Sequence, residues 1–335
     1  MKKHFATIIY ATVAFLSGVV MMSTSCTARA EEGGSGHYFP GSMASFIDGV
    51  SPTPAFLLRY NQIYYSGSVG ANKAIPIAGS TAFGLHATSW GEGATIFWRP
   101  DGHGMIPSKH WSYAMSMTIP FLQMDVNANS VVQLPPSAGG TQVIIARGGS
   151  LGAIGDIVVI PLMLNYNFSP NTNVNFRVTE YLPTGDYGVG RLANTGKNYY
   201  TTEPTLAAIY VGTKNGREAS LFAGLDFNSE NNATQYKTGD QFHLDGTLAQ
   251  HLPLMKGLAG IGVSSFYYTQ FTGDSGSGAT LGKFEGKTAG IGPVVSYIKP
   301  FGHKQLMAEL KWLNEYYTHN RLQGNTVFFK IALKC

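Results

Sequence analysis

Residues 217–228 read REASLFAGLDFN, and this stretch decides the fold class of the chain. Every odd position from 219 to 227 is apolar, whereas Glu218, Ser220, Asp226 and Asn228 place polar groups on most of the even positions. Successive side chains of a β-strand point to opposite faces. The stretch therefore predicts a strand with one apolar and one polar face.

The same two-residue alternation recurs along the chain, most clearly at 241–252, 305–316 and 325–335. Together with weaker segments it predicts about twelve strands, although 80–99 is long enough for two. The predicted strands are 55–66, 80–99, 111–125, 155–168, 173–183, 201–213, 217–228, 240–252, 257–272, 285–299, 304–319 and 325–335.

After the first few, the connections between these strands alternate between short and long, and the short ones carry turn-forming residues such as Asn215-Gly216. Tight turns at one end, longer loops at the other and an even strand number are typical of outer-membrane barrels. We therefore expect an all-β fold, a transmembrane antiparallel β-barrel over residues 55–335, with both ends of the chain in the periplasm. The alternative is a soluble secreted β-protein with an aromatic-rich core. Aromatic residues near strand ends fit interface girdles: Tyr64, Tyr65, Trp98, Tyr166, Tyr267, Tyr268, Trp312, Tyr316 and Tyr317.

The N-terminus has the order of a secretory signal peptide. Lys2 and Lys3 precede an apolar stretch at 5–22, and Ala28-Arg29-Ala30 forms a small-x-small cleavage site. We expect residues 1–30 to be removed near Ala30 and the protein to reach the outer membrane of a Gram-negative bacterium. A buried or anchoring helix and a lipid anchor on Cys26 are the alternatives. After cleavage Cys335 is the remaining cysteine, so no intrachain disulfide is expected.

Composition narrows the function classes. Only 13% of the residues are charged, 12% are aromatic and the formal net charge is +4, much of it in the leader. A chain with so many aromatic residues is not a disordered or acidic tail protein. No run of lysine or arginine exceeds two residues, which argues against a nucleic-acid partner.

Residues 31–54 precede the first predicted strand and show no alternation, with a turn expected at Pro40-Gly41. Exposed Phe and Met side chains are unfavourable in the periplasm, so we expect this segment to fold into the barrel as a plug. Phe39, Met43 and Phe46 are then candidates for ligand binding or gating. The alternative is a peripheral extension that rests on the rim.

Five short runs carry a family resemblance: GHYFPG at 36–41, PTGDY at 183–187, NSENNAT at 228–234, GDQFH at 239–243 and GDSGSGA at 273–279. The chain resembles the SphA family, also called the meta-pathway phenol-degradation family, over essentially its whole mature length. The resemblance implies an outer-membrane barrel distantly similar to long-chain fatty-acid and aromatic-hydrocarbon transporters, with a lumen plugged from the N-terminus. It implies no catalysis. One departure is Cys335, which stands where such barrels usually end in an aromatic residue read by the insertion machinery.

Inward-facing polar residues are expected to pair with one another and hold the barrel together. They are Arg177, Glu218, Asp226, His243, Asp245, Glu309 and Lys311.

Catalytic, metal and cofactor sites are not expected. His243 and His251 share a strand face but lie eight residues apart, about 26 Å, which is too far for one metal ion. The run at 273–276 resembles the nucleophile region of trypsin-like proteases, but its histidine and aspartate partners cannot be identified.

The sequence thus predicts a channel for uptake of small hydrophobic, chiefly aromatic and phenol-like compounds. Its expected partners are these solutes, outer-membrane lipid and the barrel-insertion machinery. Two other classes stay open. One is an outer-membrane lipase or acyl-transfer enzyme. The other is a structural or adhesive barrel acting through its loops at 126–154 and 184–200.

Overall fold

The computed structural model describes residues 32–100, 110–133 and 142–335. The predicted signal peptide, with Cys26 and the cleavage site near Ala30, lies outside these ranges. The helical segments are two single turns, η1 (Glu32–Gly34) and η2 (Phe46–Asp48), and no described helix is long and apolar enough to cross a membrane. The strands are β1 (Ala55–Ser68), β2 (Ala74–Ile77), β3 (Ser80–Arg99), β4 (Trp111–Gln133), β5 (Gln142–Ile154), β6 (Ile157–Ser169), β7 (Thr172–Leu182), β8 (Thr201–Val211), β9 (Arg217–Asn228), β10 (Gln241–Leu254), β11 (Gly257–Gln270), β12 (Lys287–Phe301), β13 (Lys304–His319) and β14 (Gln323–Lys334).

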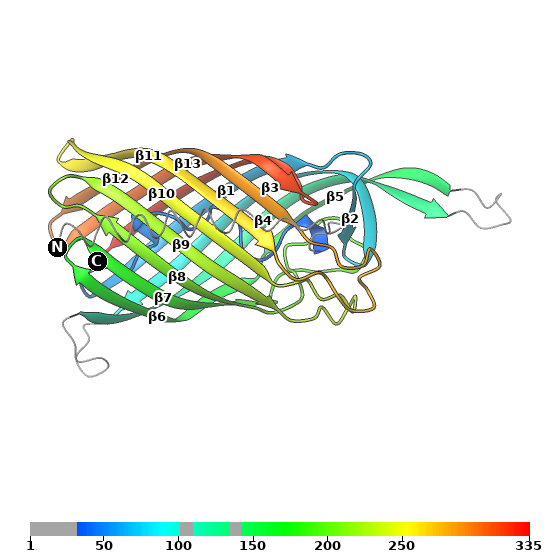
Figure 1. Ribbon diagram of the computed structural model, residues 1–335, viewed down its shortest axis with the longest axis horizontal. Helices are drawn as coiled ribbons and strands as arrows, with labels where there is room; N and C mark the ends of the chain where they lie inside the picture. Colours follow the sequence, from blue (N-terminus) through cyan, green and yellow to red (C-terminus); the bar gives the residue numbers. More distant parts are fainter. Residues whose placement is uncertain (1–31, 101–109, 134–141) are drawn as a thin grey trace.

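Antiparallel pairing runs from strand to strand and returns to its start, so the sheet closes into a barrel (Figure 1). β1 pairs with β3 on one side and with β14 on the other, from Leu57 opposite Lys334 to Ser68 opposite Gln323. Twelve of the described strands form the wall, namely β1, β3, β4 and β6 to β14. The predicted twelve-strand barrel is confirmed, and 80–99 is one strand. Closure leaves no unpaired wall edge facing lipid.

The two ends of the barrel differ as the connection lengths predict. Tight turns join β6 to β7, β8 to β9, β10 to β11 and β12 to β13, and the C-terminus lies at this end (Figure 1). In the β10–β11 turn Met255 and Lys256 have φ angles of 47° and 60°, as a type I′ hairpin requires. The long connections, including 183–200 and 271–286, gather at the opposite end. We call these the turn end and the loop end.

The prediction of a loop at 126–154 is wrong. β4 continues to Gln133, and β5 pairs with it from Phe121 opposite Ile154 to Gln133 opposite Gln142. The β4–β5 hairpin projects past the loop end of the barrel (Figure 1). Only residues 155–156 separate β5 from β6, so the two form nearly one long strand. The Gly148-Gly149 pair interrupts the alternation in β5, which is why the sequence pattern did not reveal it.

Burial alternates along the wall strands. In β9, Leu221, Leu225 and Phe227 are exposed on the outer face, whereas Glu218 and Asp226 are buried on the inner face. Apolar side chains therefore surround the barrel and polar side chains fill its lumen, which is the arrangement that lipid outside and a polar lumen inside require.

Two residues of the expected aromatic girdle face the lumen instead. Tyr268 is fully buried, and Tyr65 contacts Phe39 of the N-terminal region. Tyr267, the sequence neighbour of Tyr268, is exposed on the outer face, in keeping with strand alternation. At the chain end, the exposed Cys335 donates its amide to the carbonyl of Phe56 at 2.9 Å, which extends the β1–β14 pairing by one residue.

Candidate functional site

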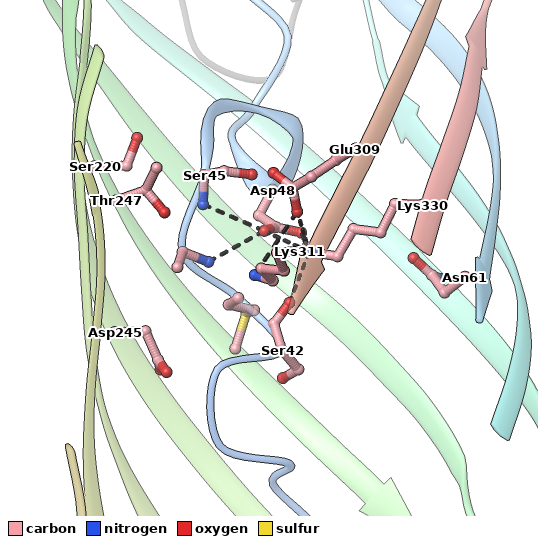
Figure 2. Close-up of polar contacts among 12 residues, drawn as sticks. Ser42, Ser45, Asp48, Asn61, Ser220, Asp245, Thr247, Glu309, Lys311 and Lys330 are labelled. Atoms are coloured by element: carbon pink, nitrogen blue, oxygen red, sulfur yellow. Dashed lines mark hydrogen bonds and ion pairs between the residues drawn. The ribbon is translucent and has the colours of Figure 1, made fainter. Parts of the chain in front are cut away.

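The N-terminal segment, residues 32–54, lies among the inward-facing side chains of the barrel. Its backbone and side chains bind residues of β1, β7, β9, β10 and β14, which lie on different sides of the wall. Figure 2 shows part of this segment surrounded by wall strands. Its partners therefore come from different sides of the barrel, and they are inward-facing side chains of the wall.

The carboxylate of Asp48 is the centre of a buried charge cluster (Figure 2). Both of its oxygens lie 2.7 Å from Lys330 Nζ on β14, and Oδ1 accepts a hydrogen bond from Arg59 Nη1 on β1 at 3.1 Å. The Asp48 carbonyl accepts from Arg177 Nη2 on β7 at 2.9 Å. We call Asp48, Arg59, Arg177 and Lys330 the Asp48 cluster.

Backbone hydrogen bonds within the segment orient the Asp48 side chain. Its Oδ2 accepts the amide of Ala44 at 3.1 Å, so the side chain folds back over the start of η2. Lys330 Nζ also donates to the Ser42 carbonyl at 2.6 Å. One wall lysine therefore fixes both the chain before η2 and the carboxylate at its end.

A second anchor lies toward the loop end, around Tyr38. The Tyr38 hydroxyl donates to Asp245 Oδ2 on β10, and the Tyr38 ring stacks on His243 with centroids 3.5 Å apart. Asp245 Oδ1 accepts the Gly41 amide at 2.7 Å. Gly41 has a φ of 83°, and a Cβ there would lie 2.4 Å from Leu313 Cδ1. Glycine is therefore needed at the predicted Pro40-Gly41 turn.

The three apolar residues predicted as ligand-binding or gating groups point at the wall. Phe39 makes edge-to-face contacts with Tyr65 and Phe328 at 5.7 and 5.8 Å. Met43 packs against the apolar cluster of Ala207, Ile209 and Phe222. Phe46 meets the His251 ring edge-to-face at 5.4 Å, while its amide donates to Glu218 Oε1 at 2.8 Å. They anchor the segment, and their role toward a solute stays a prediction.

The segment divides the lumen into two cavities. The first, about 390 Å³, lies toward the loop end and is lined by residues 32–40, Leu192 and Phe328 among others. The second, about 730 Å³, lies toward the turn end and is lined by residues 46–52 and Asn171 among others. Asp48 and Arg59 line both cavities. The Asp48 cluster is therefore the boundary between them.

All seven polar residues predicted to face the lumen are buried there, with at most 4% of their surface exposed. Some of them pair as expected: Lys311 Nζ lies 3.7 Å from Glu309, and Asp245 lies 3.1 Å from His243 Nδ1. Others bind partners that the prediction did not name. Glu218 lies 2.8 Å from His251 Nε2, and Arg177 binds the backbone of the N-terminal segment.

Sequence reasoning missed several residues of the site: Tyr38, Asp48, Arg59 and Lys330. Lys330 sits in the alternation of the last strand at an inward position, so its orientation was visible in the sequence. Asp48 had no such signal, because the segment that carries it has no period and its partner Lys330 is 282 residues away.

Comparison with known proteins places the chain in a family. The family described as "Putative MetA-pathway of phenol degradation" matches residues 78–331. The chain belongs to this family. None of the curated protein sequences compared matches it.

The barrel of this chain resembles solved structures of outer-membrane proteins. An outer membrane channel from Pseudomonas putida F1 aligns over 85% of this chain and 97% of its own, with a TM-score of 0.62 and 13% identity. This likeness supports the fold. Two more distant matches are the β-domain of the Bordetella autotransporter BrkA (TM-score 0.44, 10% identity, 84% of this chain and 98% of that one) and a Pseudomonas aeruginosa FadL homologue (TM-score 0.39, 8% identity, 84% and 90%).

The runs that carried the family resemblance meet at the loop end. His37 of the first run lies 2.9 Å from Asp156, which also accepts the Gly185 amide of the second run at 2.8 Å. Asp274 of the last run accepts the Gly239 amide at 2.9 Å and a hydrogen bond from the Tyr236 hydroxyl. These motif residues therefore hold the loops and the N-terminal segment together. Both carboxylate oxygens of Asp274 already accept hydrogen bonds within the loops.

Burial shifts the pKa of several loop-end groups. Burial lowers the pKa of Lys197 to about 8, while Glu32 and Asp156 oppose the shift. Lys197 Nζ donates to the backbone and to the hydroxyl of Ser35 in the N-terminal segment. Burial also lowers the pKa of His37, against the effect of its contact with Asp156. For Asp274, burial raises the pKa to about 7 and outweighs the hydrogen bonds that the carboxylate accepts.

Proposed function

We propose that the protein is an outer-membrane channel for uptake of small hydrophobic, chiefly aromatic solutes, and that the N-terminal segment is its plug. The observation that carries the proposal is the pair of cavities that meet at Asp48 and Arg59. Volumes of about 390 and 730 Å³ lie in the range of small-molecule sites, roughly 300–1,000 Å³. A one-ring solute fits in either cavity and is stopped between them while the segment stays docked.

The chemistry of the first cavity supports an aromatic solute. Phe39, Tyr65 and Phe328 line it, and Phe39 contacts each of the other two rings edge-to-face. Aromatic pairs in this geometry contribute about 0.5–1.5 kcal/mol beyond the area they bury. A phenol-like ring can take the same contacts, and the polar groups of the lumen offer hydrogen bonds to its hydroxyl. The family's association with phenol degradation agrees with this chemistry.

The fold supports the proposed cellular setting. The apolar outer face of the closed barrel suits a lipid bilayer, and an outer-membrane location requires export by the predicted signal peptide with cleavage near Ala30. In this setting the loop end faces the outside and the turn end faces the periplasm. Solute then enters at the smaller cavity and leaves from the larger one.

Uptake of labelled phenol at low concentration tests the proposal. Cells lacking the protein are complemented with the wild type, with a variant lacking residues 34–48, or with Arg191→Gln as a matched control. Arg191 forms an exposed ion pair with Asp186 at the loop end, away from the boundary between the cavities. We expect the deletion to raise phenol uptake several-fold while the barrel still assembles, and Arg191→Gln to leave uptake unchanged. Uptake that is unchanged in cells lacking the whole protein contradicts the channel, and phospholipid hydrolysis by the purified barrel would favour an enzyme.

A further inference from the structure

A cluster of buried ligand atoms lies on three neighbouring strands beneath the N-terminal segment. Glu203 on β8, Asp226 on β9 and His243 on β10 each offer a ligand atom, and these atoms all lie within 4.8 Å of one another. None of the three residues is exposed to solvent. Strand pairing sets them side by side, because β9 pairs with both β8 and β10 in this region.

Two members of the cluster have buried atoms without a hydrogen-bond partner. Neither carboxylate oxygen of Asp226 has a hydrogen-bond partner among the described residues, and His243 Nε2 makes no hydrogen bond there either. A buried carboxylate with both oxygens unpaired is costly unless something in the site satisfies it. Asp245 adds a third carboxylate next to the one imidazole. The cluster therefore has unfilled ligand positions and an excess of acidic groups.

The remaining groups hold these ligands in fixed orientations. Glu203 accepts hydrogen bonds from Tyr181 at 2.7 Å and from Thr205 at 2.6 Å. His243 is held through Nδ1 by Asp245 at 3.1 Å, which leaves Nε2 for the cluster. A carboxylate that binds the far nitrogen of a metal-ligating histidine is a recurrent support in metal sites, since it fixes the ring and raises its basicity.

We propose that Glu203, Asp226 and His243 bind one divalent transition-metal ion, of which Zn²⁺ is the best match. His243 Nε2 lies 3.3 Å from Glu203 Oε1. Zinc–nitrogen and zinc–oxygen bonds near 2.1 Å place tetrahedral ligand atoms about 3.4 Å apart. One imidazole with two carboxylates suits Zn²⁺ better than Ca²⁺ or Mg²⁺, which prefer oxygen ligands alone. This goes against the sequence-based expectation of no metal site, which compared His243 only with His251.

The ion would act on the docking of the N-terminal segment. Tyr38 stacks on His243, a proposed ligand, and donates to Asp245, the residue that orients His243. An occupied site holds the His243 ring in one position and keeps Asp245 available to Tyr38. The metal is thus expected to stabilise the loop-end part of the segment in the lumen.

Zinc binding by the purified full-length barrel in detergent tests the proposal. The protein carries Cys335→Ser, because an exposed thiol binds zinc by itself, and is stripped with a chelator before titration with ZnCl₂. We expect one Zn²⁺ per chain by calorimetry and elemental analysis, and a higher thermal unfolding temperature with zinc. Asp226→Asn should weaken zinc binding at least tenfold. Asp245→Asn, which removes no proposed ligand but weakens the support of His243, should weaken it about 10- to 100-fold.

His251→Gln is the matched control. His251 is also a buried lumen histidine on β10, but its contact is with Glu218, outside the cluster, so its replacement should leave the zinc affinity unchanged. Heat-modifiable mobility shows that each variant is a folded barrel. The proposal is overturned if the wild type binds no zinc, if Asp226→Asn binds it as tightly as the wild type, or if Ca²⁺ binds in preference to Zn²⁺.

Discussion

The N-terminal segment is anchored to the wall at two residues, Tyr38 and Asp48. The two anchors differ in which side supplies the carboxylate. At Asp48 the segment supplies a carboxylate and the wall supplies cations, Arg59 and Lys330. At Tyr38 the segment supplies a neutral hydroxyl and the wall supplies the carboxylate of Asp245. The first anchor depends on buried charges, whereas the second depends on a hydrogen bond and ring stacking.

The difference matters because of where each anchor lies. Asp48 lines both cavities, so its ion pairs stand at the boundary that a solute must cross. Tyr38 lines only the cavity nearer the loop end. A buried ion pair is expensive to break by removing one partner, since the other charge is left uncompensated. We therefore expect the charged anchor to control passage and the neutral anchor to position the segment.

The largest expected effect comes from Asp48→Asn, which breaks the charged anchor. The variant leaves Lys330 Nζ without the carboxylate that now lies 2.7 Å away. Removing one partner of a buried pair typically costs about 3–5 kcal/mol. We expect the segment to undock and the two cavities to join, which raises the single-channel conductance in planar bilayers several-fold.

The control for this experiment is Asp186→Asn. Asp186 pairs with Arg191 at 2.9 Å, but both side chains are about half exposed, so the pair contributes little. Conductance should stay at the wild-type level. Equal conductance in Asp48→Asn and the wild type would show that the boundary does not depend on the charged anchor.

Tyr38→Phe is expected to have a smaller effect, limited to the neutral anchor. The variant keeps the ring that stacks on His243 and removes only the hydroxyl that donates to Asp245. A hydrogen bond to a charged group contributes about 1.5–3 kcal/mol. Hydrogen exchange should become faster at residues 32–43 and stay unchanged at 44–54. Faster exchange over the whole segment would mean that the two anchors are not independent.

The same comparison shows what the sequence could reveal. The ends of the strands at 217–228 and 304–319 were predicted correctly, because lipid on one side and a polar lumen on the other impose a period of two. The orientation of Asp245, Glu218 and the other lumen residues followed from the same period. This pattern tells which way a side chain points and nothing about which residue it meets.

The contacts depend on features that a period of two does not carry. Asp48 lies in a segment without periodicity, and Lys330 is 282 residues further along the chain. Glu203, Asp226 and His243 come together only through the pairing register of three strands, β8, β9 and β10. Predicting either cluster requires the register of the sheet and the path of the segment, which the sequence alone does not fix.

The two anchors also differ in their titratable neighbours, and Lys197 at the loop end makes docking there depend on pH. Burial lowers the pKa of Lys197 from its usual 10.5 to about 8 in the docked state, where Nζ donates to Ser35. Between pH 8 and pH 10.5 the undocked state binds more protons than the docked state, so docking becomes more stable as pH rises. This added stability of docking is lost as the pH falls through about 8.

From pH 7.5 to 9 we expect hydrogen-exchange protection of residues 32–43 to increase by about 1 kcal/mol, since one pKa unit corresponds to about 1.4 kcal/mol. Lys197→Met lacks the titrating amine and should flatten this dependence, while exchange at residues 44–54 should follow pH equally in both proteins. If protection of 32–43 falls over this range in the wild type, the ammonium form of Lys197 is the one that stabilises docking. The loop-end anchor would then depend on charge as the Asp48 cluster does, and the contrast between the two anchors would be wrong.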